Sequence, residues 1–266
     1  MSNCGGCPNA GKCSPDAQAG CGVENNEYNQ IGKVFAVMSG KGGVGKSTTT
    51  ALLARALRRQ GYSVGVLDAD ITGPSMPRLM GVADGKVEQG MFGLVPPEDE
   101  YGIPVMSLNL LLESEDQPVI WRGPVIASVI KQFWKDVFWG KRDFLLIDLP
   151  PGTGDAALTA LQSLPVNGVV LVSIADEMAV MIVKKALNMA RKMEIPVLGY
   201  ILNMTYVQCA GCRERTPLYD DPAARRAMQD SGIPMLAELP FMRGLEAGNT
   251  EADAAMDACA RAIMNQ

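Results

Sequence analysis

Six short apolar runs that alternate with longer helical patterns determine which class of fold this chain adopts. The runs are rich in β-branched residues and are bounded by Gly, Pro or Asp, as buried strands usually are. We expect strands at Val34–Ser39, Val64–Asp68, Pro104–Leu108, Phe144–Leu149, Gly168–Ile174 and Val197–Asn203, and a seventh at Met235–Leu239. We expect helices at Lys46–Gln60, Pro124–Phe138, Asp155–Ser163, Met178–Met193, Pro222–Asp230 and Thr250–Met264. Because the strands are almost continuously apolar, the sheet should be mostly parallel and covered by helices on both faces, which is a three-layer α/β fold.

Residues 1–27 differ in composition from the rest of the chain. They contain Gly, Asn, Pro, Ala and Cys but almost no large apolar side chain. Such a segment cannot bury enough apolar surface to form a core of its own. The sequence therefore predicts a short Cys-rich N-terminal extension over residues 1–27, followed by one α/β domain over residues 28–266.

A glycine-rich loop follows the first expected strand and opens the first expected helix. It matches the pattern G-x-x-x-x-G-K-[ST] with Gly40, Lys41, Gly42, Gly43, Val44, Gly45, Lys46 and Ser47. The glycines allow backbone N–H groups to surround a phosphate, and the helix N-terminus adds partial positive charge. We expect Lys46 to contact the β- and γ-phosphates, Ser47 to ligate Mg²⁺ and Thr48 to contact the α-phosphate. The expected fold class is therefore a P-loop NTPase, and ATP is the favoured nucleotide because the sequence has no N-K-x-D guanine motif.

Polar side chains also lie at the ends of three other expected strands. Asp68 and Asp70 lie at the end of the second strand, and Asp148 at the end of the fourth. Mg²⁺ and an attacking water need anionic partners beside a phosphate loop, so we expect Asp148 and Asp70 to serve the reaction and Asp68 to support them. Asn203 ends the sixth strand, and its amide can both donate to and accept from the edge of an adenine. Asp155 is expected to cap the helix that follows it.

The chain has seven cysteines and no histidine, so any metal site must rely largely on thiolates. Four of them lie close to the N-terminus, at Cys4, Cys7, Cys13 and Cys21, and two form the C-x-x-C pair Cys209 and Cys212. No secretory signal pattern opens the chain, which favours a reducing, cytoplasmic location and metal binding rather than disulfides. One pair cannot fill the four positions around a metal, so either another chain completes the site or the pair is a redox couple. Cys259 lies in an Ala-rich helix and is expected to be a core residue.

Charge and hydropathy disfavour two classes of partner. The formal net charge is −5 and the isoelectric point is about 4.9, which disfavours non-specific binding to nucleic acid or to an anionic membrane. Apolar runs such as Gly168–Ile174 are far shorter than the roughly 18 residues that a membrane span needs. We therefore expect no nucleic-acid partner and no membrane partner.

Five segments together resemble the Mrp/Nbp family of P-loop ATPases, which carry or scaffold iron–sulfur clusters. The segments are K-G-G-V-G-K-S-T, D-A-D-I-T-G-P-S, W-R-G-P, D-L-P-P-G-T-G-D and N-M-T-Y-V-Q-C-A-G-C, within residues 32–248. The extra lysine of the loop resembles the deviant Walker A motif of the MinD/ParA/nitrogenase-iron-protein superclass, which implies that Lys41 reaches the phosphates of a partner subunit in a homodimer. The resemblance also implies that Asp148 occupies the Walker B position, that Asp70 orients or deprotonates the attacking water, and that Asn203 reads the adenine base.

The same resemblance implies a cluster site shared between two subunits. In that family, paired cysteines from both subunits hold a bridging [4Fe–4S] cluster, which would make Cys209 and Cys212 its ligands and apo iron–sulfur proteins its recipients. Some members hold a second cluster on an N-terminal extension with four cysteines. Here the spacing is C-x₂-C-x₅-C-x₇-C, with Cys21 after the core pattern rather than a lone cysteine before it. For residues 4–21 an iron–sulfur cluster, a structural Zn²⁺ site and a metal-free redox or docking segment all stay open.

Two other functions are found with loops of this kind. A spatial organiser of the MinD or ParA type would need a basic amphipathic tail or a basic DNA-binding face, but residues 250–266 carry three acids and one Arg. A nitrogenase-like electron donor takes its cluster ligands singly from separate loops, which a C-x-x-C pair does not match. The sequence therefore favours a weak ATPase whose useful output is cluster assembly and transfer.

Overall fold

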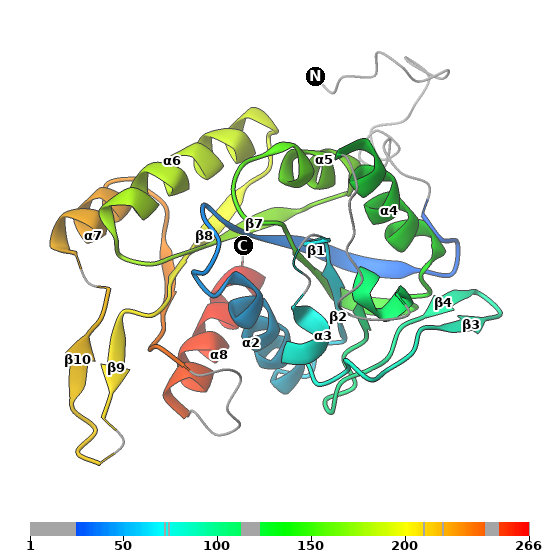
Figure 1. Cartoon of the computed structure of the whole chain (residues 1–266), viewed down its shortest axis with the longest axis horizontal. Helices are drawn as coiled ribbons and strands as arrows, with labels where there is room; N and C mark the ends of the chain where they lie inside the picture. The colour runs from blue at the N-terminus through cyan, green and yellow to red at the C-terminus, as the bar shows by residue number, and fades with distance from the viewer. Residues whose placement is uncertain are drawn as a thin grey trace.

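The computed structural model describes residues 25–71, 73, 75–112, 123–209, 211–219, 221–242 and 250–265. Within them a seven-stranded sheet runs through the centre of the molecule in the order β11-β8-β7-β1-β6-β2-β5 (Figure 1). Its strands are β1 (Gln30–Ser39), β2 (Val64–Asp68), β5 (Val105–Met106), β6 (Lys141–Asp148), β7 (Gly168–Ser173), β8 (Val197–Leu202) and β11 (Met235–Glu238). All neighbouring strands in it are parallel. The expected parallel sheet is confirmed, including its seventh strand.

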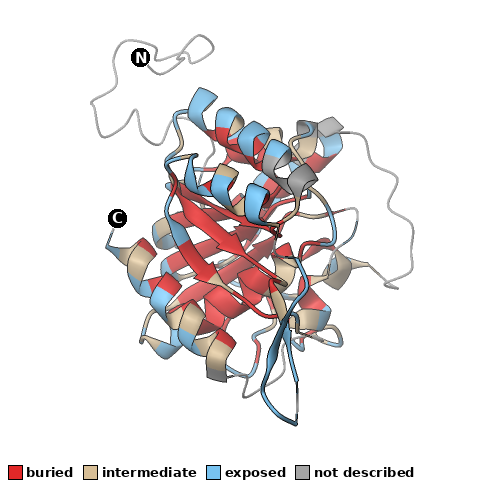
Figure 2. Ribbon diagram, turned by 90° about the vertical axis from the view of Figure 1, so that its left-hand side faces the viewer, coloured by how far each residue is buried: buried red, intermediate tan, exposed pale blue. Residues whose placement is uncertain are grey.

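Helices cover both faces of the sheet, so the predicted three-layer P-loop NTPase fold is confirmed. The α-helices are α2 (Lys46–Arg59), α3 (Met76–Leu79), α4 (Gly123–Asp136), α5 (Asp155–Ser163), α6 (Glu177–Lys192), α7 (Pro222–Gln229) and α8 (Thr250–Met264). Apolar residues of α4, α5, α6 and α7 pack on one face, against strand residues such as Leu145 and Leu171. Apolar residues of α2, α3 and α8 pack on the other face, against Phe35 and Leu146. Buried side chains are accordingly concentrated in the strands between these layers (Figure 2).

The edge strand β5 is shorter than the sequence predicts. The run Pro104–Leu108 is a strand only at Val105–Met106, and Leu108 begins the 3-10 helix η1 (Leu108–Leu111). Within the sheet β5 pairs with β2 alone, and on its other side the Val105 N–H donates to the Pro97 carbonyl at 2.9 Å. The buried Ser107 between the two elements donates its hydroxyl to Asp68 Oδ2 at 3.1 Å. The chain therefore leaves the sheet early to support a residue at the end of β2.

Two antiparallel hairpins lie outside the central sheet. One pairs β3 (Glu88–Gly90) with β4 (Gly93–Val95), and the other pairs β9 (Tyr206–Gln208) with β10 (Arg215–Pro217). Hydrophobic patterning does not predict them because their strands are short and largely exposed. The β9–β10 hairpin extends away from the body of the molecule, and the C-x-x-C pair lies between its two strands (Figure 1).

Several expectations fall on residues that are not described. The Cys-rich segment over residues 1–27 is described only from Asn25 onward, so Cys4, Cys7, Cys13 and Cys21 lie outside the described residues. Trp121 and Arg122 of the W-R-G-P segment do so as well. In the part of the chain that is described, no helix has the length and apolar character needed to cross a membrane.

Candidate functional site

The phosphate loop lies at the carboxyl end of β1, where it leads into α2. Gly43 and Gly45 have φ angles of 80° and 79°, a left-handed conformation that residues with side chains rarely adopt. Gly45 is the N-cap of α2, and no side chain caps the first N–H groups of this helix. The loop borders a cavity of about 350 Å³ that is also lined by Lys46, Ser47, Thr48 and Asp70. Uncapped N–H groups at a helix start beside a lysine form a site for an anion.

Lys46, Ser47 and Asp148 form a polar network at this cavity. The Lys46 Nζ lies 2.7 Å from Asp148 Oδ1, and the Ser47 hydroxyl donates to Asp148 Oδ2 at 2.5 Å. The Thr50 hydroxyl donates to Asp148 Oδ1 at 2.9 Å; the sequence reading missed Thr50, although it lies one helical turn after Lys46. Asp148 is 0% exposed, at the end of β6. Hydroxyl and carboxylate oxygens are the ligands that Mg²⁺ prefers, so Ser47 and Asp148 fit a magnesium site.

Asp68 and Asp148 are register partners on the adjacent strands β2 and β6. Asp68 is buried, and its carboxyl accepts from the Ser107 hydroxyl and from the Asp70 N–H, each at 3.1 Å. Burial, followed by repulsion from the Asp148 carboxylate, raises the pKa of Asp68 to about 8, although the Lys46 charge lowers it. Burial and the neighbouring carboxylate therefore favour the protonated form of Asp68. Its carboxyl also accepts from the backbone N–H of Asp70, a residue that lines the cavity of about 350 Å³ at the phosphate loop, which we call the phosphate cavity.

The raised pKa of Asp68 makes stability depend on pH. A carboxyl whose pKa is higher in the folded chain than in the unfolded chain stabilises the fold at low pH, and this contribution is lost as the pH rises through the folded value of about 8. In Mg²⁺-free buffer this group should therefore lower the free energy of unfolding by about 1.4 kcal/mol per pH unit between roughly pH 5 and pH 7, and the slope should level off as the pH passes the folded pKa of about 8. Asp68→Asn has no titrating proton here and should lose that part of the slope in urea unfolding. An identical slope in the variant would show that Asp68 does not have a raised pKa.

The segment from Asp148 to Gly152, which follows β6, passes beside the loop. The Gly152 N–H donates to the Ser39 carbonyl at 2.9 Å, which joins the segment to the end of β1. The helix after it, α5, begins at Asp155 and has Gly154 as its N-cap. The expectation that Asp155 caps this helix is therefore wrong, because the backbone is still extended at Gly154 and helical geometry starts at Asp155 itself.

Lys41, the second lysine of the loop, does not line the phosphate cavity. Its Nζ lies 2.7 Å from Oδ2 of Asp176. Asp176 was not among the residues that the sequence singled out, although it follows the end of β7 as Asp70 follows the end of β2. The signal that could have found it is therefore the same one, a carboxylate just beyond a buried strand.

Asn203 follows β8 and contacts the phosphate loop. Its Nδ2 donates to the Val44 carbonyl at 2.9 Å, and a Cβ on Gly45 would lie only 2.2 Å from the same nitrogen. The close approach of loop and side chain therefore requires glycine at that position. The Asn203 Oδ1 is buried and accepts no hydrogen bond from the described residues. A buried acceptor beside this loop suits the amino group of adenine, and the base-reading role of Asn203 stays a prediction.

Cys209 and Cys212 lie in the turn of the β9–β10 hairpin, and both are exposed. The Arg213 N–H donates to the Cys209 carbonyl at 2.9 Å and closes the turn. Hydrogen bonds from the backbone N–H groups of Cys212 and then Gly211 lower the pKa of Cys209, which favours the thiolate form that binds metal. Across the described ranges, no three or more Cys, His, Asp or Glu side chains gather into a metal site. The pair thus offers two ligands of the four that a tetrahedral site needs.

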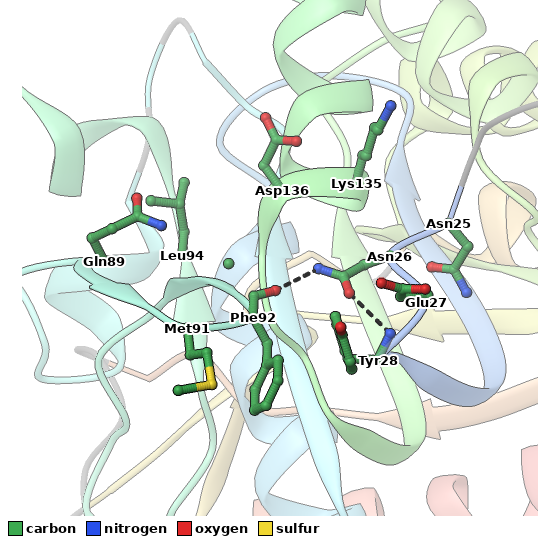
Figure 3. A pocket seen from close by; sticks show the side chains of 11 residues that line it. Asn25, Asn26, Glu27, Tyr28, Gln89, Met91, Phe92, Leu94, Lys135 and Asp136 are labelled. Carbon is green, nitrogen blue, oxygen red and sulfur yellow. Dashed lines mark hydrogen bonds between the residues drawn. The ribbon is translucent and has the colours of Figure 1, made fainter.

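The remaining described cysteine and a second cavity do not belong to these sites. Cys259 belongs to α8 and its side chain is buried in the core, as expected. The second cavity, of about 910 Å³, lies at the start of β1 and is bordered by the β3–β4 hairpin and the end of α4 (Figure 3). There the Asn26 Nδ2 donates to the Phe92 carbonyl at 2.9 Å, and the Tyr28 and Phe92 rings lie 4.4 Å apart. The described residues that line it include none of the phosphate loop and no cysteine, so the smaller cavity is the candidate nucleotide site.

Comparison with known proteins agrees with this arrangement. A family model described as ParA, NUBPL iron-transfer P-loop NTPase, matches residues 30–265. The iron-sulfur cluster carrier protein of Clostridium perfringens (strain 13 / Type A) is 42% identical to this chain over 268 aligned positions, which cover 94% of each protein. The iron-sulfur cluster carrier protein of Methanocaldococcus jannaschii is 41% identical over 244 positions, which cover 90% of this chain and 83% of that protein.

Solved structures show the same relationship. A nucleotide-binding protein from Archaeoglobus fulgidus, solved in complex with ADP, is 42% identical, covers 89% of both chains and superposes with a TM-score of 0.71. The cell division ATPase MinD of Pyrococcus furiosus is 22% identical with a TM-score of 0.57, covers 88% of this chain and 99% of its own, and shares the fold alone. The resemblance inferred from five sequence segments is thereby confirmed. Because the family model spans most of the chain and the relatives match along most of their length, this chain belongs to the family of NUBPL iron-transfer P-loop NTPases.

Proposed function

We propose that this protein binds and hydrolyses ATP and uses that cycle to assemble a [4Fe–4S] cluster and transfer it to apoproteins. The observation that carries the proposal is the exposed thiol pair Cys209 and Cys212, on a hairpin whose first strand begins at Tyr206. Asn203, which contacts the phosphate loop, lies only three residues before that strand. One short stretch of chain therefore joins the thiol pair to the nucleotide site. The relatives from C. perfringens and M. jannaschii are both named iron-sulfur cluster carrier proteins, which supports the same role here.

ATP hydrolysis is assigned to the loop and to the two strand ends beside it. Lys46 and the backbone N–H groups of the loop would neutralise the charge on the β- and γ-phosphates. Asp70 lines the same cavity and would orient or deprotonate the attacking water. Mg²⁺, held by Ser47 with Asp148, would supply positive charge to the phosphates when bound. Hydrolysis is expected to be slow, because its useful result is a change in how the protein holds the cluster and not the release of ADP and phosphate.

A homodimer would supply what one chain lacks at both sites. One Cys209–Cys212 pair provides two thiolates, and two chains provide the four that a [4Fe–4S] cluster needs. Lys41 of one chain would contact the phosphates bound to the other chain. Because both contacts belong to one dimer, the nucleotide state can change the free energy of holding the cluster.

The proposal extends to the N-terminal cysteines and to location. Cys4, Cys7, Cys13 and Cys21 would hold a second iron–sulfur cluster, with a Zn²⁺ site and a metal-free redox or docking segment as the alternatives. The recipients would be apo iron–sulfur proteins of the cytoplasm. A Caenorhabditis briggsae relative, 39% identical over 251 residues, is named a cytosolic Fe-S cluster assembly factor NUBP1 homolog, which supports that location.

Cluster transfer tests the proposed function. The protein is reconstituted anaerobically with iron and sulfide, separated from small ions, and mixed with the apo form of an enzyme that is active only with a [4Fe–4S] cluster. We expect the activity of the recipient to return while the visible absorbance of the carrier falls, even with an iron chelator present. The same iron and sulfide without the carrier should restore nothing under those conditions. If the carrier keeps its cluster and the recipient stays inactive with ATP and with ADP, the transfer role is wrong.

A further inference from the structure

The ion pair between Lys41 and Asp176 joins the phosphate loop to the residue that precedes α6. Lys41 follows β1 by two residues, and Asp176 follows β7 by three. Because β1 and β7 are parallel neighbours, both residues lie at the same edge of the sheet. The Nζ to Oδ2 distance of 2.7 Å is thus a direct consequence of the strand order.

Each lysine of the loop has its own carboxylate within the chain, but the two pairs differ in burial. The pair of Lys46 with Asp148 is almost fully buried, with side-chain exposures of 6% and 0%. The pair of Lys41 with Asp176 is about one-third exposed, with side-chain exposures of 34% and 31%. Exposed pairs of this kind are weak and exchange partners readily. Since Lys46 lines the phosphate cavity and Lys41 does not, Asp176 holds the Lys41 ammonium away from that cavity.

We propose that Asp176 is a positioning residue that retains Lys41 within its own chain and must release it before Lys41 can contact a phosphate across the dimer. The inference rests on the proposed function, because it takes Lys41 to act on the nucleotide of a partner chain. Only the side chain has to move, since the Ser39 hydroxyl donates to the Lys41 carbonyl at 3.0 Å and holds the loop backbone in place. Lys41 exchanges a carboxylate for a more highly charged phosphate, so Asp176 opposes dimer closure until a nucleoside triphosphate is present.

Substitutions at Asp176 can separate its charge from its structural role. Asp176 immediately precedes α6, and asparagine is as favourable as aspartate before a helix. Asp176→Asn should therefore fold normally, which thermal unfolding can verify, while it loses the charge that holds Lys41. Asp176→Glu keeps the charge and is the rescue variant. Lys41→Ala removes the cation and provides the background in which the pair no longer exists.

The test is the dimer dissociation constant with a slowly hydrolysed ATP analogue, measured by sedimentation velocity. Asp176→Asn should tighten the dimer about two- to thirty-fold, the range expected when two exposed ion pairs that compete with it, one in each chain, are lost. The difference should shrink as salt is raised, because salt screens the pair in the wild-type protein. Asp176→Glu should behave like the wild type, and Asp176→Asn should have no effect in the Lys41→Ala background.

Two results overturn the inference, and they can be told apart. The first is that Lys41→Ala weakens the dimer while Asp176→Asn leaves the dissociation constant unchanged, or changes it as much in the Lys41→Ala background as in the wild type. Asp176 then does not restrain Lys41, but the proposed dimer still stands. If Lys41→Ala dimerises with the ATP analogue as well as the wild type, Lys41 has no role across the dimer. In that case the part of the proposed function in which Lys41 contacts the partner's nucleotide is wrong, and the inference that Asp176 restrains Lys41 is wrong as well.

Discussion

Lys46→Ala is expected to reduce ATP turnover roughly 100-fold or more, because a charge aimed at the transferred phosphoryl group is lost. Lys46 is the only lysine that lines the phosphate cavity as the described residues form it. Its ammonium also neutralises Asp148, from which it lies 2.7 Å away. The variant would leave the buried Asp148 with the hydroxyl groups of Ser47 and Thr50 as its remaining donors. Nucleotide affinity and turnover should both fall, as measured by calorimetric titration and phosphate release.

A matched lysine elsewhere controls for this experiment. Lys192 lies exposed in the last turn of α6, so Lys192→Ala should hydrolyse ATP at the wild-type rate. Thermal unfolding of both variants establishes that each is folded. A folded Lys46→Ala protein that hydrolyses ATP as fast as Lys192→Ala would show that the loop is not the nucleotide site.

Cys209→Ser is expected to abolish the [4Fe–4S] cluster that we propose two chains share. A serine hydroxyl stays protonated at neutral pH, so the substitution removes one thiolate ligand per chain and two per dimer. The fold should be unaffected because Cys209 is exposed in a hairpin turn. After anaerobic reconstitution, bound iron and acid-labile sulfide should fall by one cluster per two chains, and dimerisation that depends on the cluster should disappear.

Cys259→Ala is the matched control for Cys209→Ser. Cys259 is buried in the core, so its truncation should lower the free energy of unfolding by about 1 kcal/mol and leave iron and sulfide content unchanged. The two variants remove the same atom type from the same half of the chain. Equal, wild-type iron content in both would mean that the C-x-x-C pair does not hold the cluster.

Patterning predicted the central sheet because burial leaves a continuous apolar signal. β7 and the second half of β1 are buried on both faces, and such runs have few alternatives to a central parallel sheet. The β9–β10 hairpin gave no such signal, since its strands have three residues each and are mostly exposed. Helix α3, with four residues, is too short for a helical period to be recognised. Elements defined by the core were therefore predictable, and elements at the surface were not.

Motif spacing predicted residues that lie together at the candidate nucleotide site but not the pairs they form. The placement of Lys46 and Ser47 beside the cavity at the start of α2 follows from the local geometry of the loop. The contact of Lys41 with Asp176 depends on β7 lying beside β1, and the sequence does not specify that strand order. The raised pKa of Asp68 depends on its burial beside a second carboxylate on a neighbouring strand. Both features arise from long-range packing, which short motifs do not encode.

Native mass spectrometry of the anaerobically reconstituted protein decides whether two chains share one cluster through Cys209 and Cys212. We predict a species whose mass is that of two chains plus one [4Fe–4S] cluster, in addition to any metal that each chain carries by itself. This species should persist in Cys259→Ala and vanish in Cys209→Ser. Clusters found only on single chains, or a two-chain species whose iron content Cys209→Ser leaves unchanged, would contradict the shared site.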